Sequence, residues 1–230
     1  MRLAEIHPVQ SLLFDLDGTL IDSCPGIASS LAMAFRAAGR TMPPADLRVV
    51  IGPPIRLIAM RIDPTLTEAE LAQIETAFRN DYDTNGWRET VLFDEVVRGL
   101  QQLRKLGVQL FLITNKPKIP TNRIVTHFGI TDLFEDIVTR DSRAPSYSGK
   151  SEMLSELLLR HGLRAESTVM VGDTAEDAEA AEINGLDFIH ASYGYGSIGN
   201  PRRSIASFSE LWGALSAKDS RKSAIHTHEI

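Results

Sequence analysis

Short runs of apolar residues alternate along this chain with longer segments in which apolar residues recur every three or four positions. The runs predict buried β-strands, and the longer segments predict amphipathic helices. A continuous apolar run is typical of a parallel sheet, because helices cover both of its faces. The alternation therefore predicts an α/β fold with a Rossmann-like parallel sheet. The five predicted strands are residues 11–17, 108–115, 135–140, 167–173 and 187–192.

One long interval after the first strand has helical patterns and no convincing strand. The patterns cover residues 26–38 and 68–81, whereas the helices predicted elsewhere are residues 95–106 and 151–161. We therefore expect an inserted all-helical domain, and a disordered tail where the sequence becomes polar and aperiodic. The expected boundaries are 1–21 and 90–216 for the core, 22–89 for the insert and 217–230 for the tail.

Composition and charge restrict the class of protein. The 230 residues are 43% hydrophobic and 23% charged, as in an ordinary globular protein. A formal net charge of −6 with no stripe of Lys and Arg argues against nucleic acid as a partner. The single cysteine, Cys24, excludes an internal disulfide and fits a reducing compartment.

Neither export nor membrane insertion is predicted. The first ten residues lack a long apolar run after a basic start, and no stretch approaches the roughly 18 apolar residues of a membrane helix. We therefore expect a cytoplasmic protein without a membrane partner. Nothing in the sequence indicates its oligomeric state.

Polar side chains collect where the predicted strands end, which is where open α/β sheets bind their ligands. Each of these residues alone is an ordinary strand-end or helix-start residue, but their convergence at one edge predicts a single site. They are Asp15 and Asp17 at the first strand, Thr114 and Asn115 at the second, Asp173 at the fourth, and Lys150 just before a predicted helix.

The pair Asp15 and Asp17 is the strongest of these signals. The two side chains point the same way because the strand period is two, and Gly18 permits a sharp turn of the backbone. Such a pair binds a hard cation such as Mg²⁺, or divides nucleophilic attack and proton transfer between two carboxylates. A solvated acidic turn is the alternative, and the apolar run before the pair disfavours it.

Four motifs resemble, in order, those of the haloacid dehalogenase superfamily in its phosphatase branch. The resemblance covers about residues 11–196, and TNKP together with YGYG is most similar to phosphoglycolate phosphatase-like enzymes. The helical insert has the position of that family's cap. The motifs are FDLDGTL with Asp15 and Asp17, LITNKP with Thr114, SGKSE with Lys150, and VGDTAEDAEAAEING with Asp173 and Asp177.

The resemblance implies an Mg²⁺-dependent phosphatase that acts on a small phosphorylated metabolite. Asp15 would attack phosphorus and carry a transient aspartyl-phosphate. Asp17 would protonate the leaving alkoxide and later deprotonate the attacking water. Asp15, the backbone carbonyl of Asp17, and Asp173 would hold the Mg²⁺, and Asp177 would orient water bound to it.

The resemblance also implies how the substrate is held. Thr114, Asn115 and Lys150 would bind the phosphoryl oxygens, and the charge of Lys150 would help to keep Asp15 ionised. Residues 52–62 of the insert resemble the substrate-specificity region of the family's cap. Arg56 in that region is our candidate for binding a second anionic group, and an ordinary surface arginine is the alternative.

Some other reactions of the superfamily are disfavoured by the residues present in this sequence. The dehalogenases lack an acid at the position of Asp17, because a halide leaves without a proton. The phosphonate-cleaving relatives need a lysine in the insert, and residues 23–89 contain none. A phosphosugar mutase similar to β-phosphoglucomutase, a nucleotidase and a pyrophosphatase all stay open. A binding protein without activity is disfavoured by the complete set of motif residues.

Overall fold

The computed structural model describes residues 9–216 and contains the predicted α/β core. Six strands form one sheet in the order β5-β4-β1-β6-β7-β8, and every neighbouring pair is parallel. All five predicted strands are confirmed. A sixth, β8, was not predicted because two residues are too short to show a period. The strands are β1 (Ser11–Phe14), β4 (Gln109–Thr114), β5 (Asp136–Thr139), β6 (Thr168–Gly172), β7 (Asp187–Ala191) and β8 (Ser204–Ile205).

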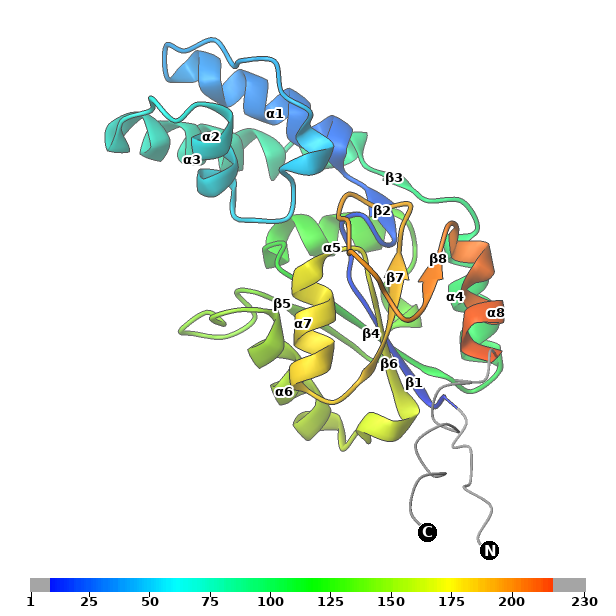
Figure 1. The fold of residues 1–230 in the computed structure, drawn as a ribbon. Coiled ribbons are helices and arrows are strands. Elements are labelled where there is room, and N and C mark those ends of the chain that lie inside the picture. The colour runs from blue at the N-terminus through cyan, green and yellow to red at the C-terminus, as the bar shows by residue number, and fades with distance from the viewer. Residues whose placement is uncertain (1–8, 217–230) are drawn as a thin grey trace, which may run out of the picture.

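Helices cover both faces of this sheet (Figure 1). Every residue of β1 is buried, and its side chains alternate between two apolar clusters, as the strand period requires. Leu12 and Phe14 belong to one cluster, and Leu13 belongs to the other. The first cluster is covered by α4 (Val96–Lys105), α5 (Lys118–His127) and α8 (Leu211–Ser216), and the second by α6 (Lys150–His161) and α7 (Ala175–Ile183).

The segment that follows β1 is helical and has an apolar core of its own. We call residues 24–89 the helical insert; between them the described chain has helices and no strand. Leu31, Phe35, Ile74 and Phe78 are among the buried residues of its core. Its helices are α1 (Cys24–Ala37), α2 (Ile55–Ile62) and α3 (Glu68–Tyr82), with short 3₁₀ turns η1 (Leu47–Val49) and η2 (Gly86–Glu89).

Two short strands connect the helical insert to the core. β2 (Ile21–Asp22) and β3 (Val91–Leu92) pair antiparallel, so the chain leaves and re-enters the core at adjacent places. Figure 1 shows the insert above the end of the sheet at which β1 finishes. The expected domain boundaries stay a prediction, and the expected tail at 217–230 lies outside the described residues. The remaining 3₁₀ turns are η3 (Thr131–Leu133), η4 (Ala165–Ser167) and η5 (Phe208–Glu210).

Capping residues explain where several of the helices begin and end. α3 starts with a capping box in which Thr67 and Glu70 bind each other's backbone. Gly107, which the sequence predicts as the end of a helix, has a φ of 82° two residues after α4. Between residues 9 and 216, no helix has both the length and the apolar character needed to span a membrane.

Candidate active site

The topology brings three of the predicted site residues to one edge of the sheet. β1 lies between β4 and β6, so the carboxyl ends of these three parallel strands are adjacent. Asp15 follows β1, Thr114 ends β4, and Asp173 follows β6 after Gly172. This is the arrangement expected from the sequence, because the carboxyl edge of such a sheet is where ligands bind.

Lys150 lies between two of the carboxylates. It is the first residue of α6, it is 3% exposed, and its Nζ donates a hydrogen bond to Oδ1 of Asp15 at 2.7 Å. The same Nζ donates to Oδ1 of Asp177. Burial favours the neutral amine, but the two carboxylates outweigh it and hold the pKa of Lys150 above its usual range. Lys150 is therefore a buried cation beside the predicted nucleophile.

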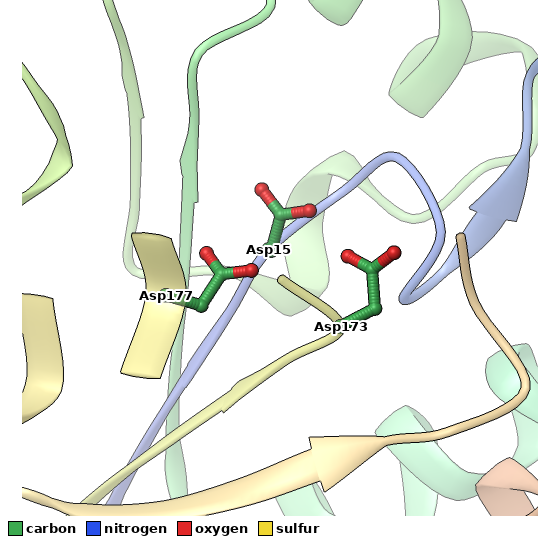
Figure 2. Close-up of side chains that lie close together, drawn as sticks. All are labelled: Asp15, Asp173 and Asp177. Carbon is green, nitrogen blue, oxygen red and sulfur yellow. The ribbon is translucent and has the colours of Figure 1, made fainter. Parts of the chain in front are cut away.

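Three buried carboxylates meet next to this lysine. Figure 2 shows the side chains of Asp15, Asp173 and Asp177 pointing from three elements toward one region. One oxygen atom of each lies within 4.8 Å of the others. Carboxylate oxygens are hard donors of the kind that Mg²⁺ prefers. The donor set therefore fits the expected cation.

Burial and mutual repulsion make this acidic cluster costly in the absence of a metal ion. Burial raises the pKa of Asp173 to about 6, and the charge of Asp177 acts in the same direction. Burial also raises the pKa of Asp15 well above its usual value, and Lys150 opposes this shift. As expected, the charge of Lys150 lowers the pKa of Asp15. Burial and the charges of Asp177 and Asp173 outweigh this effect. A divalent cation would offset this repulsion.

Asp173 is also held by the loop that contains YGYG. Its Oδ2 accepts hydrogen bonds from the N–H groups of Tyr195, at 2.7 Å, and Gly196, at 3.2 Å. On the other side, a Cβ at Gly18 would lie 2.2 Å from the same oxygen, and Gly18 has a φ of 84°. Glycine is therefore required at position 18 both by the backbone conformation and by the close approach of Asp173.

Asp177 has a structural contact as well as its contact with Lys150. Thr174 is the N-cap of α7, and its hydroxyl donates to Oδ2 of Asp177 at 2.7 Å in a capping box. Asp177 thus stabilises the start of α7 and contacts Lys150 at the same time. The N-cap of α7 is Thr174 and not the neighbouring Asp173.

The side chain of Asp17 lies apart from the acidic cluster and beside a lysine that the sequence did not identify. Its Oδ1 accepts hydrogen bonds from Nζ of Lys116, at 2.8 Å, and from the hydroxyl of Ser23, at 2.5 Å. Lys116 Nζ also lies 4.7 Å from the ring centroid of Tyr82 in the helical insert. Lys116 follows Thr114 by two residues, and the strand period was the signal that could have identified it.

Asn115 and Thr114 have partners within the protein. Nδ2 of Asn115 donates to Oε2 of Glu176 at 2.9 Å, and its buried Oδ1 has no hydrogen-bond partner in the described chain. Glu176 was not predicted; its place in the first turn of α7, beside Asp177, is its only signal in the sequence. Oγ1 of Thr114 accepts from the N–H of Lys116 at 3.1 Å, which leaves the hydroxyl proton for a ligand.

A cavity of about 720 Å³ connects these residues with the helical insert. Arg56 does not border it. The Arg56 guanidinium forms an ion pair with Glu68 and lies 3.9 Å from Glu75. The structure therefore does not bring Arg56 to the other site residues, and its role in substrate binding stays a prediction. The predicted site residues that border the cavity are Asp15, Asp17, Thr114, Asn115 and Lys150.

Comparison with known proteins gives both a family and individual relatives. A family model described as haloacid dehalogenase-like hydrolase matches residues 12–191. The tyrosine-protein kinase PtkA of Mycobacterium tuberculosis is 37% identical over 190 residues, which are 81% of this chain and 63% of that protein. The chain thus spans less than two thirds of the length of this relative.

One further relative, and one solved structure, match over most of their length. The phosphoglycolate phosphatase of Colwellia psychrerythraea is 32% identical over 199 residues, which are 83% of this chain and 88% of that protein. A solved structure of PtkA from Mycobacterium tuberculosis has a TM-score of 0.77 at 35% identity. It covers 91% of this chain and 99% of the solved one.

Proposed function

Because this chain belongs to the haloacid dehalogenase-like hydrolase family, we propose that it is an Mg²⁺-dependent phosphatase that hydrolyses a small phosphate monoester. The observation that carries the proposal is the environment of Asp15. This carboxylate is 5% exposed, borders the cavity, belongs to the acidic cluster and is bound by Lys150 at 2.7 Å. A buried carboxylate with a cationic partner at a cavity has the features of a nucleophile.

In the first half of the proposed reaction, Asp15 attacks phosphorus. One oxygen of its carboxylate forms the new bond to phosphorus, while Lys150 holds the carboxylate through Oδ1. The bond between phosphorus and the ester oxygen breaks, and that oxygen takes a proton from Asp17. The product alcohol leaves, and Asp15 carries the phosphoryl group. Lys116 and Ser23 then stabilise the carboxylate that Asp17 has become.

In the second half, water replaces Asp15 on phosphorus. Asp17 takes a proton from the water as its oxygen forms a bond to phosphorus. The bond between phosphorus and Asp15 breaks, inorganic phosphate leaves, and both carboxylates return to their starting states. Because Asp17 reverses its role between the two halves, its position must stay the same in both, and the contacts with Lys116 and Ser23 provide this.

The other site residues bind and orient the phosphoryl group. Lys150 supplies a charge and the hydroxyl of Thr114 supplies a hydrogen bond, and both border the cavity beside Asp15. Asp15 and Asp173 would hold the Mg²⁺, with Asp177 near enough to contribute. When bound, Mg²⁺ would screen the repulsion between the carboxylate and the phosphate and hold the phosphoryl group in line.

Replacement of the nucleophile tests this proposal. Asp15→Asn keeps the size of the side chain but removes the negative oxygen that attacks phosphorus. We expect the variant to lose turnover of p-nitrophenyl phosphate with Mg²⁺ to the level of the assay without enzyme. Asp94→Asn changes an exposed aspartate in the same way and should keep full activity. Unimpaired turnover by Asp15→Asn would overturn the proposal.

A second candidate function is phosphoryl transfer from ATP to a protein tyrosine. Its support is the relative named tyrosine-protein kinase, of which this chain spans 63%. Incubation with γ-labelled ATP and a tyrosine-containing copolymer distinguishes the two functions. A kinase transfers label to the polymer, whereas the proposed phosphatase releases label as inorganic phosphate or not at all. An assay for isomerised sugar phosphate with catalytic bisphosphate tests the mutase alternative.

A further inference from the structure

Three arginines border the cavity in addition to the residues that would bind the phosphoryl group. Arg61 lies on α2, Arg79 on α3, and Arg140 in the loop after β5. Arg61 follows Ile55 and Ile58 at intervals of three residues, and all three border the cavity, so they share one face of α2. The helical insert and the core thus both contribute guanidinium groups to the same cavity.

None of these three arginines forms an ion pair with a carboxylate in the described part of the chain. Other arginines of the helical insert do: Arg40 binds Glu70, and Arg48 binds Asp22. Two further carboxylates border the cavity, and both have other partners. Asp141 accepts hydrogen bonds from the N–H of Lys118 and the hydroxyl of Thr139, and Glu176 binds Asn115.

Guanidinium groups that border a cavity and form no ion pair in direct contact with a carboxylate are suited to an anionic ligand, although the charge of Arg79 also acts on Asp83. The planar fork of arginine binds a carboxylate or a phosphate through two parallel hydrogen bonds. The protein has a formal net charge of −6, so three arginines at one cavity are not explained by an overall excess of positive charge.

The walls and the size of the cavity describe the rest of the ligand. Apolar side chains border it from three parts of the helical insert, among them Ile27, Ile51 and Phe78. A volume of about 720 Å³ lies within the range of roughly 300–1,000 Å³ that holds ligands of drug size. A two-carbon phosphate such as phosphoglycolate would fill only a small part of it.

We propose that Arg61, Arg79 and Arg140 form a second anion-binding subsite, and that the substrate is a phosphate monoester with an apolar body and a second negatively charged group. The inference rests on the proposed phosphatase function, because it names the substrate class of that site. It replaces Arg56, the candidate from the sequence, with arginines that border the cavity. The phosphate would lie at Asp15 and the second anion at the arginines.

A pair of matched substrates tests the subsite. 4-(Carboxymethyl)phenyl phosphate and 4-ethylphenyl phosphate have the same ring and similar leaving groups, and only the first has a second anion. The measurement is the ratio of kcat/KM for the charged substrate to that for the uncharged one. For the wild-type protein we expect a ratio of about ten or more, since a hydrogen-bonded charge pair contributes on the order of a tenfold effect.

Single variants then assign the effect to residues. We expect Arg61→Gln, Arg79→Gln and Arg140→Gln each to lower this ratio several-fold. Arg36→Gln removes an exposed arginine of α1 that does not border the cavity, and it should leave the ratio unchanged. Arg56→Gln compares the two hypotheses directly. The inference would be overturned if Arg56→Gln lowered this ratio and the variants of the three cavity arginines did not.

The outcomes also separate this inference from the proposed function. If the wild-type protein hydrolyses both substrates with the same kcat/KM, the phosphatase function stands and the subsite is rejected. If it hydrolyses neither of them, nor p-nitrophenyl phosphate, the phosphatase function is rejected and the subsite with it. A ratio well above one that falls only with the cavity arginines supports both. Melting temperatures of all variants show whether each is folded.

Discussion

The ammonium group of Lys116 lies 2.8 Å from Oδ1 of Asp17 and 4.7 Å from the ring centroid of Tyr82. Lys116 is 8% exposed; burial lowers its pKa, but the charges and hydrogen bonds of Asp17 and Tyr82 together outweigh this effect and raise it. One lysine at the end of β4 thus contacts both the predicted acid–base residue and the helical insert. Lys116 is a positioning residue for Asp17 in the proposed reaction.

Replacement of Lys116 should affect substrates according to their leaving groups. Lys116→Met removes the hydrogen bond that holds Asp17 but keeps the length of the side chain. We expect kcat for an alkyl phosphate to fall by about 10- to 100-fold, because an alkoxide needs the proton of Asp17. The fall for p-nitrophenyl phosphate should be smaller, because nitrophenolate leaves without a proton.

Lys118→Met is the matched control, since Lys118 is an exposed lysine of the same segment. It should leave kcat for both substrates unchanged. An equal loss for the alkyl and the nitrophenyl substrate with Lys116→Met would contradict the positioning role and indicate a general loss of structure.

The hydroxyl of Tyr195 connects the site to the start of the helical insert. It accepts hydrogen bonds from the N–H groups of Ser23, at 2.7 Å, and Cys24, at 3.1 Å, and it donates to Asp22 at 2.8 Å. Tyr195→Phe leaves the N–H of Ser23 without this partner, whereas the N–H of Cys24 keeps its hydrogen bond to Asp22. We expect the free energy of unfolding to fall by about 1–3 kcal/mol. Urea denaturation measures this change.

Tyr147→Phe provides the comparison for activity. Its hydroxyl donates to Glu156 at 2.8 Å, away from the helical insert. This variant should lose stability without a change in KM, whereas Tyr195→Phe should change KM, because Asp22 to Cys24 set the position of the insert over the cavity. Identical kinetics for Tyr195→Phe and the wild-type protein would show that the connection has no part in substrate binding.

The acidic cluster predicts how Mg²⁺ changes stability. A ligand that binds only the folded state stabilises it by about 2.7 kcal/mol at a concentration of 100 Kd. For a chain of this size that raises the melting temperature by roughly 5–10 °C. We expect such a rise for the wild-type protein and a much smaller one for Asp173→Asn. Thermal denaturation with EDTA and with excess Mg²⁺ measures both.

The melting temperature of the metal-free protein provides a second test. Burial raises the pKa of Asp173 to about 6, so its charged form destabilises the metal-free fold above that pH. In EDTA at pH 8, Asp173→Asn should therefore melt at the same temperature as the wild-type protein or higher. Asp94→Asn should respond to Mg²⁺ as the wild-type protein does. A metal-free Asp173→Asn that melts well below the wild-type protein would contradict this account.

Glu70 predicts a pH dependence of stability in the helical insert. The side chain of Arg40 lowers the pKa of Glu70 to about 2, and the backbone and hydroxyl of Thr67 act in the same direction. The folded pKa lies below the unfolded value near 4.5. The stabilisation by Glu70 is therefore complete above about pH 4.5 and is lost as the pH falls toward 2.

Urea denaturation of the wild-type protein and of Glu70→Gln between pH 3 and 7 measures this effect. The difference in the free energy of unfolding should be largest near pH 7 and should shrink as the pH falls below 4.5. Glu166→Gln, at an exposed glutamate of η4, should show no such trend. A difference between wild type and Glu70→Gln that is constant with pH would show that the charge of Glu70 does not cause it.

The sequence predicted the strands well and the insert in outline. The strands β1, β4 and β6 are continuous apolar runs, and such runs can be identified without knowledge of their neighbours. β8 and the β2–β3 pair were not predicted because two residues show no period. The sequence did not show which face of α2 borders the cavity. Arg56 binds Glu68 of α3, whereas Arg61, five residues later, borders the cavity.

By itself the sequence determined five of the six strands, the edge of the sheet at which polar side chains collect, and Asp15 as the candidate nucleophile. These follow from local properties, because apolar runs predict strands and each strand ends beside its own polar residues. Only the tertiary structure decided that Lys116 meets Asp17 and that Lys150 meets Asp177 as well as Asp15. Lys116 and Asp17 are 99 positions apart, and Lys150 and Asp15 are 135 apart. Such pairs depend on how whole elements pack, and that is not a local property of the chain.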